Sequence, residues 1–400
     1  MKKKVVILLM MSAMLLLGGC GSGKGDAAAG KADDIAESRE SGEEKKESEE
    51  GNSTKGGSGI STGIDETTTN IYGTCGIDVK WFYQDGTLVI RGSGAMSGTM
   101  DLESYKEYIQ TLIIEEGVMS IDSRMFEEYP NLTDVTIMNG VTKINDYAFR
   151  NCPNLKSVVL PDSLNSIGQL AFEDCSSLTE IVIPDSVTEI KMYAFSKSGL
   201  KEITIPGSIK KIASAAFGSC SDLVKVTILD GVETIEDSTF TDCTSLTEVT
   251  IPGSVTMIGE YAFSGCESLT DVVIPDSVTT IKREAFRDCN NLTSVTLSNS
   301  LTAIAGSVFG ECINLTEIVI PDSVEIIESK AFSECTSLTK ITIPDSVEVI
   351  EGGAFYNCTN LQEVIILNAN IDIKNNLWGF PTFPDGTKII INGNEQIWSN

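Results

Sequence analysis

A phenylalanine recurs at an almost constant interval through most of this 400-residue chain. Ten steps separate eleven such residues; nine steps span 23 residues, and the step from Phe195 to Phe217 spans 22. A fixed period in this range is typical of stacked-repeat proteins, in which each short coil contacts only its neighbours. The period therefore predicts a solenoid rather than a globular domain with one deep cleft. The recurring residues are Phe126, Phe149, Phe172, Phe195, Phe217, Phe240, Phe263, Phe286, Phe309, Phe332 and Phe355.

The unit Leu246–Cys266, LTEVTIPGSVTMIGEYAFSGC, shows how one coil is built. Its first six residues put apolar side chains on one face and are rich in β-branched residues, which predicts a short strand. Pro252-Gly253-Ser254 ends that strand, because proline cannot donate to a sheet ladder and Pro-Gly favours a turn. Tyr261-Ala262-Phe263 is expected in a short helical or 3₁₀ turn. One unit cannot bury its own apolar face, so the units must stack, with parallel strands and right-handed crossovers.

The repeating pattern L-x-x-[IV]-x-[IL]-P-x-S-[VL]-x-x-I-x-x-x-A-F-x-x-C resembles the BspA-like, treponemal-type class of leucine-rich repeats. Leu315–Cys335, LTEIVIPDSVEIIESKAFSEC, matches it at every position. The resemblance implies a right-handed α/β solenoid with a parallel concave sheet of short strands and 3₁₀ or helical turns on its convex side. It also implies a place on a bacterial surface and a role in adhesion or protein binding.

The start of the chain reads as an export signal. Three lysines precede a short apolar run, and Leu17-Gly18-Gly19-Cys20 resembles a lipobox, in which the cysteine carries a lipid. We therefore expect an exported lipoprotein that is anchored to a membrane through Cys20 on the bacterial cell surface. An ordinary signal peptide with a chance cysteine is the alternative. Residues 21–70 are rich in Gly, Ser, Glu and Lys and are expected to form a disordered acidic linker.

The repeats are expected to lie between two caps. Residues 109–360 hold eleven units, and residues 361–400 hold a partial repeat and a C-terminal cap. Residues 71–108 are expected to form an N-terminal cap with a β-hairpin, because Asp85-Gly86 separates two strand-like segments. All three tryptophans, Trp81, Trp378 and Trp398, fall within these caps. They are interpreted as seals for the open ends of the stack.

Nine of the eleven cysteines occupy one slot in successive repeats. Metal binding needs converging ligands, and the spacing offers none. Disulfides between adjacent turns remain an alternative, but stacked side chains run parallel rather than toward one another. We favour buried free thiols that act as small apolar fillers. Tyr129 fills the slot in the first unit, and the 22-residue unit has no cysteine there. The nine are Cys152, Cys175, Cys220, Cys243, Cys266, Cys289, Cys312, Cys335 and Cys358.

No catalytic site is predicted. Histidine is absent from the sequence, which removes Ser-His-Asp and Cys-His pairs and most zinc sites. Gly18–Lys24 approaches a phosphate-binding loop but lacks the final Ser or Thr and the preceding strand. Ser337–Lys340 fits S-x-x-K, yet other repeats carry Ser-Leu-Thr-Glu at the same place. We therefore expect no enzyme activity, no cofactor and no metal.

Side chains that alternate with the core positions of each strand are expected on the concave face. They form a central row of Thr, Val and Ile beside a mostly acidic row. The net charge of −28 disfavours nucleic acid and favours a protein partner with a basic patch. A merely solvated face is the alternative. The predicted partner-binding residues are Glu180, Val182, Glu202, Thr204, Thr227, Glu248, Thr250, Asp271, Val273 and Glu317.

The sequence thus predicts a lipid-anchored leucine-rich repeat protein that mediates protein–protein interaction or adhesion through its concave face. Aromatic residues are missing from both rows of the repeats, which argues against sugar binding there. Two other functions stay open: a solute-binding type of lipoprotein that captures a ligand, and an envelope spacer without a specific ligand.

Overall fold

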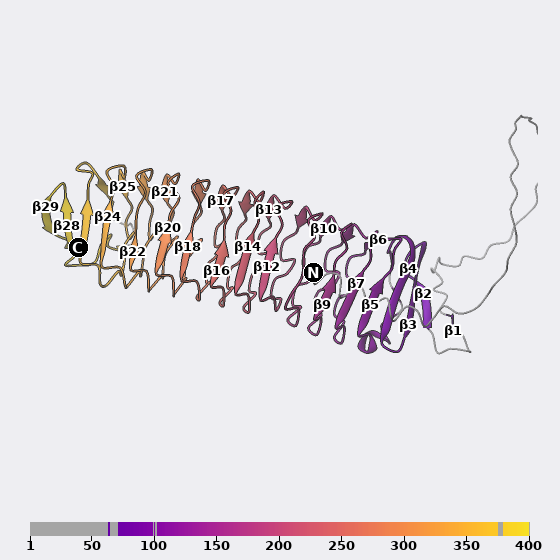
Figure 1. Ribbon diagram of the computed structural model, residues 1–400. Helices are drawn as coiled ribbons and strands as arrows, with labels where there is room; N and C mark the ends of the chain where they lie inside the picture. Colours follow the sequence, from indigo (N-terminus) through magenta and orange to yellow (C-terminus); the bar gives the residue numbers. More distant parts are fainter. Residues whose placement is uncertain (1–62, 65–70, 99, 101, 375–378, 400) are drawn as a thin grey trace, which may run out of the picture. The chain divides into compact units, whose positions relative to one another are not determined.

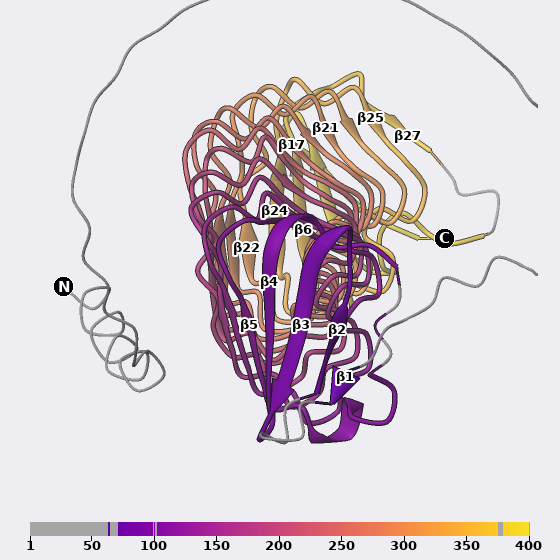
Figure 2. The same cartoon turned by 90° about the vertical axis from the view of Figure 1, so that its right-hand side faces the viewer.

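The computed structural model describes residues 63–64, 71–98, 100, 102–374 and 379–399, all within one compact unit, Ser58–Asn400. The predicted signal segment, its lipid-attachment residue Cys20, most of the linker and Trp378 lie outside the described residues. The described residues form a right-handed β-solenoid, as predicted, and its coils follow one another in sequence order (Figure 1). Figure 2 looks along the stack and shows the coils superposed.

Most coils contribute one strand to a first row of parallel strands. The 23-residue period sets the register of this row: Lys225 pairs with Glu202 on one side and with Glu248 on the other. The solvent-exposed side of this row is called the concave face below. The strands are β5 Thr111–Ile114, β7 Asp134–Ile137, β9 Ser157–Val159, β12 Glu202–Ile205, β14 Lys225–Ile228, β16 Glu248–Thr250, β18 Asp271–Val273, β20 Ser294–Thr296, β22 Glu317–Ile318, β24 Lys340–Ile343, β26 Glu363–Ile366 and β28 Lys388–Ile391.

A second row of shorter strands follows the turn that ends each first-row strand. The sequence marks this segment only by one apolar pair per unit, such as Val255 and Ile258, and no strand was predicted there. The strands are β6 Val118–Ile121, β8 Lys143–Ile144, β10 Ser166–Ile167, β11 Glu189–Ile190, β13 Lys211–Ile212, β15 Thr234–Ile235, β17 Met257–Ile258, β19 Thr280–Ile281, β21 Ala303–Ile304, β23 Ile326–Ile327, β25 Val349–Ile350 and β27 Asp372–Ile373.

The convex side consists of β-turns, so the predicted helical or 3₁₀ turns are wrong. In one coil, Ala262 N–H donates to the Gly259 carbonyl and Ser264 N–H to the Tyr261 carbonyl. Tyr261 has a φ of 57°, the left-handed conformation that a type II turn needs at its third position. The Phe263 N–H donates to Ala285 of the next coil, so these turns also form a ladder. A helix would use that N–H within its own coil.

The core is a stack of like residues, as predicted. All eleven repeating phenylalanines are fully buried, and Phe263 stacks between Phe240 and Phe286 at ring-centroid distances of 5.3 and 5.2 Å. Phe383, from the predicted C-terminal cap, continues the stack 5.3 Å from Phe355. The burial of a phenylalanine side chain contributes about 1.5–3 kcal/mol, and a repeated ring gives that contribution to every coil.

The cysteines are buried free thiols. All ten that the structure describes are unpaired, so the expected disulfide-free stack is confirmed for them. Each repeat thiol lies against a main-chain carbonyl; Cys266 Sγ is 3.3 Å from the Phe240 oxygen. In the 22-residue unit Ser198 takes the cysteine slot: its N–H donates to the Phe195 carbonyl, as the Cys220 N–H donates to Phe217, and its Oγ lies 3.3 Å from Cys220 Sγ.

Both ends of the stack carry antiparallel hairpins. At the N-terminal end, β2 Ile71–Thr74, β3 Asp78–Gln84 and β4 Thr87–Ala95 form the predicted cap, and β4 pairs in parallel with β5. The short β1, Gly63–Ile64, pairs with β2 although it falls within the range predicted as linker. The 3₁₀ helix η2, Lys106–Tyr108, follows this cap. At the other end β29, Asn394–Ile397, pairs with β28.

The tryptophans described in these caps are packed as seals. Trp81 on β3 is fully buried. Trp398 meets the Phe383 ring edge-on at 5.1 Å, so it closes the phenylalanine stack. Both placements agree with the interpretation that these rings cover open ends of the core.

Candidate functional site

The concave face presents two parallel rows of side chains. In the central row, Thr204, Thr227 and Thr250 lie side by side on β12, β14 and β16. The neighbouring row continues from Asp271 through Ser294 to Glu317 on β18, β20 and β22. These positions point outward because the residues between them enter the core. The rows are therefore placed as the sequence predicted.

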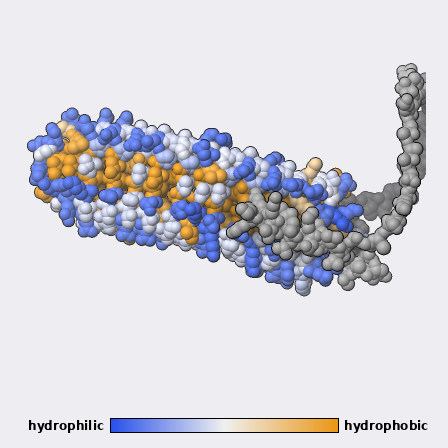
Figure 3. Space-filling view, in the orientation of Figure 1, coloured by the Kyte–Doolittle hydropathy of each residue, from blue (hydrophilic) through white to orange (hydrophobic). Residues whose placement is uncertain are grey.

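Apolar surface gathers along this face. Figure 3 shows an apolar band bordered by hydrophilic residues on both sides. Val273 and Val319 belong to the central row and are 61% and 80% exposed. Leu229 and Leu367 follow first-row strands and are 41% and 51% exposed. Exposed branched residues in a row are costly to hydrate and favour a surface that another molecule covers.

All ten predicted partner-binding residues lie on the concave face. Eight are on paired first-row strands. Glu180 and Val182 are not, because the structure has no strand at Glu180–Ile183. Nine of the ten side chains are exposed, and Thr227 is half-buried. Their role in binding stays a prediction.

Several charges on this face are neutralised by a neighbour in the same row. Lys225 Nζ lies 2.5 Å from Glu248 Oε1, and Lys340 Nζ lies 2.5 Å from Glu363 Oε1. The Lys340 hydrogen bond lowers the pKa of Glu363. Asp271 accepts a hydrogen bond from the Thr270 hydroxyl at 3.0 Å. Such pairs hold the charged side chains in a regular row, and each surface ion pair stabilises the fold by about 1 kcal/mol or less.

A depression of about 390 Å³ lies in the concave face beside Glu180–Ile183, the first-row segment that forms no strand. Five predicted residues line it: Glu180, Val182, Glu202, Thr204 and Thr227. Asp185, Lys225 and Leu229 also line it and were not predicted as site residues. Asp185 and Leu229 sit in the turns that follow the strand positions. The alternation argument covers strands alone and could not place them.

The central row extends beyond the repeats into the N-terminal cap. Val89 on β4 pairs with Ile113, which pairs with Thr136 of the first row. On the other side Val89 pairs with Phe82, which pairs with Tyr72. The absence of aromatic residues therefore holds for the repeats and ends at the cap. No sequence signal fixed this register, because it depends on how the hairpin joins β5.

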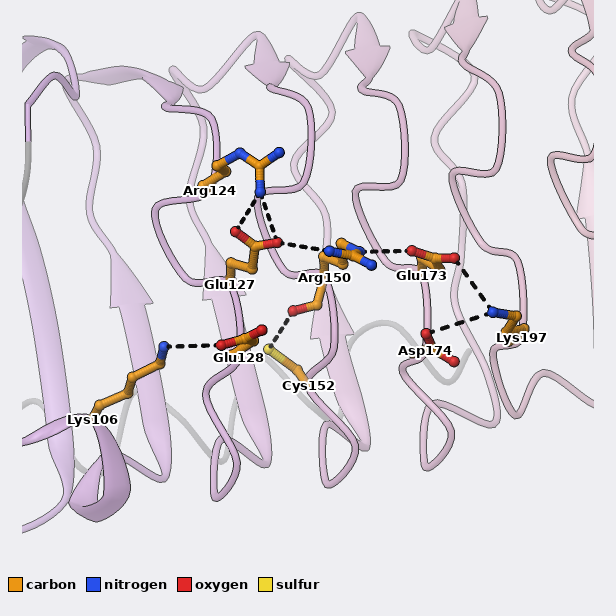
Figure 4. A network of polar contacts seen from close by, with 9 residues as sticks. All are labelled: Lys106, Arg124, Glu127, Glu128, Arg150, Cys152, Glu173, Asp174 and Lys197. Carbon is orange, nitrogen blue, oxygen red and sulfur yellow. Dashed lines mark hydrogen bonds and ion pairs between the residues drawn. The ribbon is translucent and has the colours of Figure 1, made fainter. Parts of the chain in front are cut away.

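A second polar cluster serves the stack itself. Figure 4 shows a network in which Glu127 accepts from Arg124 and Arg150 at 2.8–3.1 Å, and Glu173 accepts from Arg150 at 2.7 Å. Lys197 lies 3.7 Å from Glu173. The hydrogen bonds from Arg150 to Glu173 and Glu127 raise the pKa of that guanidinium. Since these charges are paired between neighbouring coils, the network has the form of a staple rather than of a ligand site.

The described residues show no group of side chains arranged as a metal site, and the S-x-x-K match is not arranged as a catalytic site. Within these residues no group of three or more cysteine, aspartate and glutamate side chains is placed to hold a metal ion. Lys340 of the S-x-x-K match lies on β24 and is paired with Glu363. A search for membrane-crossing helices over the same residues also finds none that combines the required length and apolarity.

Comparison with known proteins finds bacterial leucine-rich repeat structures. A leucine-rich repeat protein from Bacteroides ovatus is 24% identical over 78% of this chain and 98% of its own, with a TM-score of 0.48. A leucine rich cell surface protein from Faecalibacterium prausnitzii is 28% identical over 77% of this chain and 97% of its own, with a TM-score of 0.39. The leucine-rich repeat protein of T. pallidum is 24% identical over 52% of this chain and 87% of its own, with a TM-score of 0.39. No curated protein sequence matches the chain.

The sequence profile described as "BspA type Leucine rich repeat region (6 copies)" matches residues 104–224, 142–270, 211–336 and 256–380. These overlapping matches span every repeating phenylalanine and the whole first row from β7 to β26. The resemblance seen in the repeating pattern is thereby confirmed, and the chain belongs to the BspA-type leucine-rich repeat family.

Proposed function

We propose that this protein binds another protein through its concave face and acts in adhesion or cell-surface recognition. The observation that carries the proposal is the face itself: exposed β-branched residues in register, bordered by an acidic row. Leucine-rich repeat proteins generally bind protein partners, and a regular extended surface suits a large partner better than a small solute. The net charge of −28 favours a partner with a basic patch.

A capture experiment with two matched charge-reversal variants tests this proposal. The full-length chain is immobilised and exposed to cell-surface and extracellular-matrix extracts, and captured proteins are identified. We expect E180K/E202K/E248K on the concave face to abolish capture of a specific partner. E189K/E325K/E348K makes the same change in charge at exposed positions in or next to second-row strands and should leave capture intact. Equal capture by both variants, with normal folding of each, would show that the concave face is not the docking surface.

The proposal includes a location outside the cell and a lipid on Cys20. The three-part pattern of Met1–Cys20 supports it, together with the cell-surface description of the Faecalibacterium protein. The Cys20→Ala variant should lose the acyl chains and appear in the medium instead of the membrane fraction. Retention of this variant in the membrane fraction would contradict the anchor.

A binding role without catalysis is also proposed. The family and the absence of histidine from the sequence support it. An enzymatic activity that co-purifies with this protein, in proportion to its amount at each purification step, would refute this part of the proposal.

A further inference from the structure

One first-row segment, Glu180–Ile183, forms no strand, although the sequence around it is identical to that around a segment that does. Leu178–Ser186 and Leu315–Ser323 both read LTEIVIPDS. The second copy contributes β22 to the sheet, whereas the first has no strand and lines the depression. No backbone hydrogen bond joins Glu180–Ile183 to β9 or β12 among the described residues; the one remaining bond runs from Lys201 N–H to the Thr179 carbonyl. The main-chain groups of this segment are therefore left to other partners.

Three carboxylates at this depression have no partner. Glu180, Asp185 and Glu202 line it, and within the described residues none of them makes an ion pair or a side-chain hydrogen bond. Lys225 is the cation that lines the depression, and it turns to Glu248 instead of Glu202. Elsewhere on the face Glu248 and Glu363 each hold a lysine. Uncompensated negative charge therefore lies beside open backbone acceptors at this depression.

The floor between these carboxylates is apolar. Val182 is 68% exposed and Leu229 is 41% exposed, and both line the depression. A group that suits this surface needs an apolar stem and several hydrogen-bond donors but no acceptor. Arginine has this chemistry: three methylenes followed by a planar guanidinium with five N–H donors. A bare metal ion fits less well, because these carboxylates do not form a metal-holding group.

We propose that the depression at Glu180–Ile183 is the anchor point of the concave face and receives an arginine side chain of the protein partner. The inference rests on the proposed docking role of this face and names the group that the face recognises. The guanidinium pairs with the carboxylates of Glu180 and Glu202, and its stem covers Val182 and Leu229. Arginine is common among the few residues that dominate protein–protein binding energy. The other acidic positions then supply long-range attraction rather than a specific contact.

The test uses a peptide in place of the unidentified partner. The full-length, ¹⁵N-labelled chain is titrated with Ac-Ser-Gly-Arg-Gly-Ser-NH₂ at physiological salt, and amide shifts are followed by NMR. We expect saturable shifts confined to residues 180–185, 202–206 and 225–229. The peptide in which citrulline replaces arginine should give none, because it keeps the shape and loses the charge.

The identical sequences provide the matched control. E180Q and E202Q should each raise the dissociation constant of the arginine peptide about fivefold or more, since each removes one charge-assisted contact. E317Q removes the same charge from the same sequence context outside the depression and should have no effect. Equal weakening by E317Q, shifts spread along the whole acidic row, or no saturable shift would overturn the anchor. The capture experiment tests concave docking separately. If the E180K/E202K/E248K variant still captured the partner, docking on the concave face would be refuted whatever the peptide result.

Discussion

Each buried thiol of the stack is held away from water, and none of the described cysteines forms a disulfide. Burial raises the pKa of Cys220 to about 11 and those of Cys152 and Cys312 to about 12. Burial also raises the pKa of Cys266 well above its usual value. The thiolate is the reactive form of cysteine, so these positions are inert in the folded protein. The same residues fill space beside the phenylalanines, where a larger side chain would overpack the core.

The raised thiol pKa values predict a loss of stability in alkali. An unfolded cysteine ionises near pH 9, whereas the folded thiols stay protonated, so the unfolded state loses protons first. The stabilising contribution is complete below pH 9 and is lost as the pH rises through the folded values, by about 1.4 kcal/mol per thiol for each pH unit. The midpoint of unfolding by guanidinium chloride should therefore change little up to about pH 9 and fall steeply between about pH 9 and about pH 11. In a C243A/C266A variant the fall should be shallower; an unchanged slope would contradict this assignment.

The burial of the repeating phenylalanines and cysteines could be predicted from sequence, because it follows from their apolar side chains and from the period at which they recur. The turn at Tyr261 was predicted wrongly because nothing in a tyrosine side chain indicates a positive φ. Its conformation is imposed by the ladder in which its N–H donates to Arg283 of the next coil. A non-glycine residue with positive φ is uncommon, and only the stacked neighbours make it the better choice here.

At the scale of the coil, the unit of 22 residues differs from the others in one connecting loop. Ser198 keeps the cysteine slot, so the missing residue falls between that slot and Leu200. Gly199 makes the shorter path possible: a Cβ atom there would lie 2.1 Å from the Ser176 carbonyl oxygen. This loop leads directly into β12, which borders the interrupted segment. The shortened loop and the depression are thus adjacent features of one irregular region.

The close approach at Gly199 predicts that Gly199→Ala destabilises the protein. The added methyl group would force the backbones of two coils apart, and overpacking of this kind costs about 1–3 kcal/mol. Chemical denaturation monitored by circular dichroism measures the effect. Gly253→Ala is the matched control, because nothing lies within 4 Å of its Cβ position and it should change the stability little. Equal stability of the two variants would mean that the coils separate at Gly199 without cost.

The two copies of LTEIVIPDS show where prediction from sequence ends. Both indicate a strand by the same residues, and only the copy at Leu315–Ser323 contributes one, β22. The copy at Leu178–Ser186 opens the 22-residue unit that ends in the shortened loop, so its surroundings rather than its own composition decide the outcome. Alternation alone placed the ten site residues on the solvent-exposed side of the first row, and their role in binding stays a prediction. The depression among them depends on contacts between coils, which alternation does not describe.

At the scale of the molecule, stability is a sum over coils and the interfaces between them. Ring distances along the phenylalanine stack stay between 5.2 and 5.8 Å from Phe126 to Phe355. The coils are therefore nearly interchangeable, and the two caps protect the ends wherever the stack begins and stops. Binding specificity must then come from positions where one coil differs from the rest, such as the region of Glu180–Ile183.

Interchangeable coils predict that one whole unit can be removed. Deletion of residues 246–268 joins Ser245 to Leu269 and preserves the 23-residue register, so Phe240 should stack on Phe286 in place of Phe263. We expect a folded protein with the same circular dichroism per residue and a modestly lower midpoint, because one interface is lost. Deletion of residues 246–257 removes half a coil and leaves the second half without a first-row strand. That variant should lose cooperative unfolding, and equal behaviour of the two deletions would show that the repeats are not independent building units.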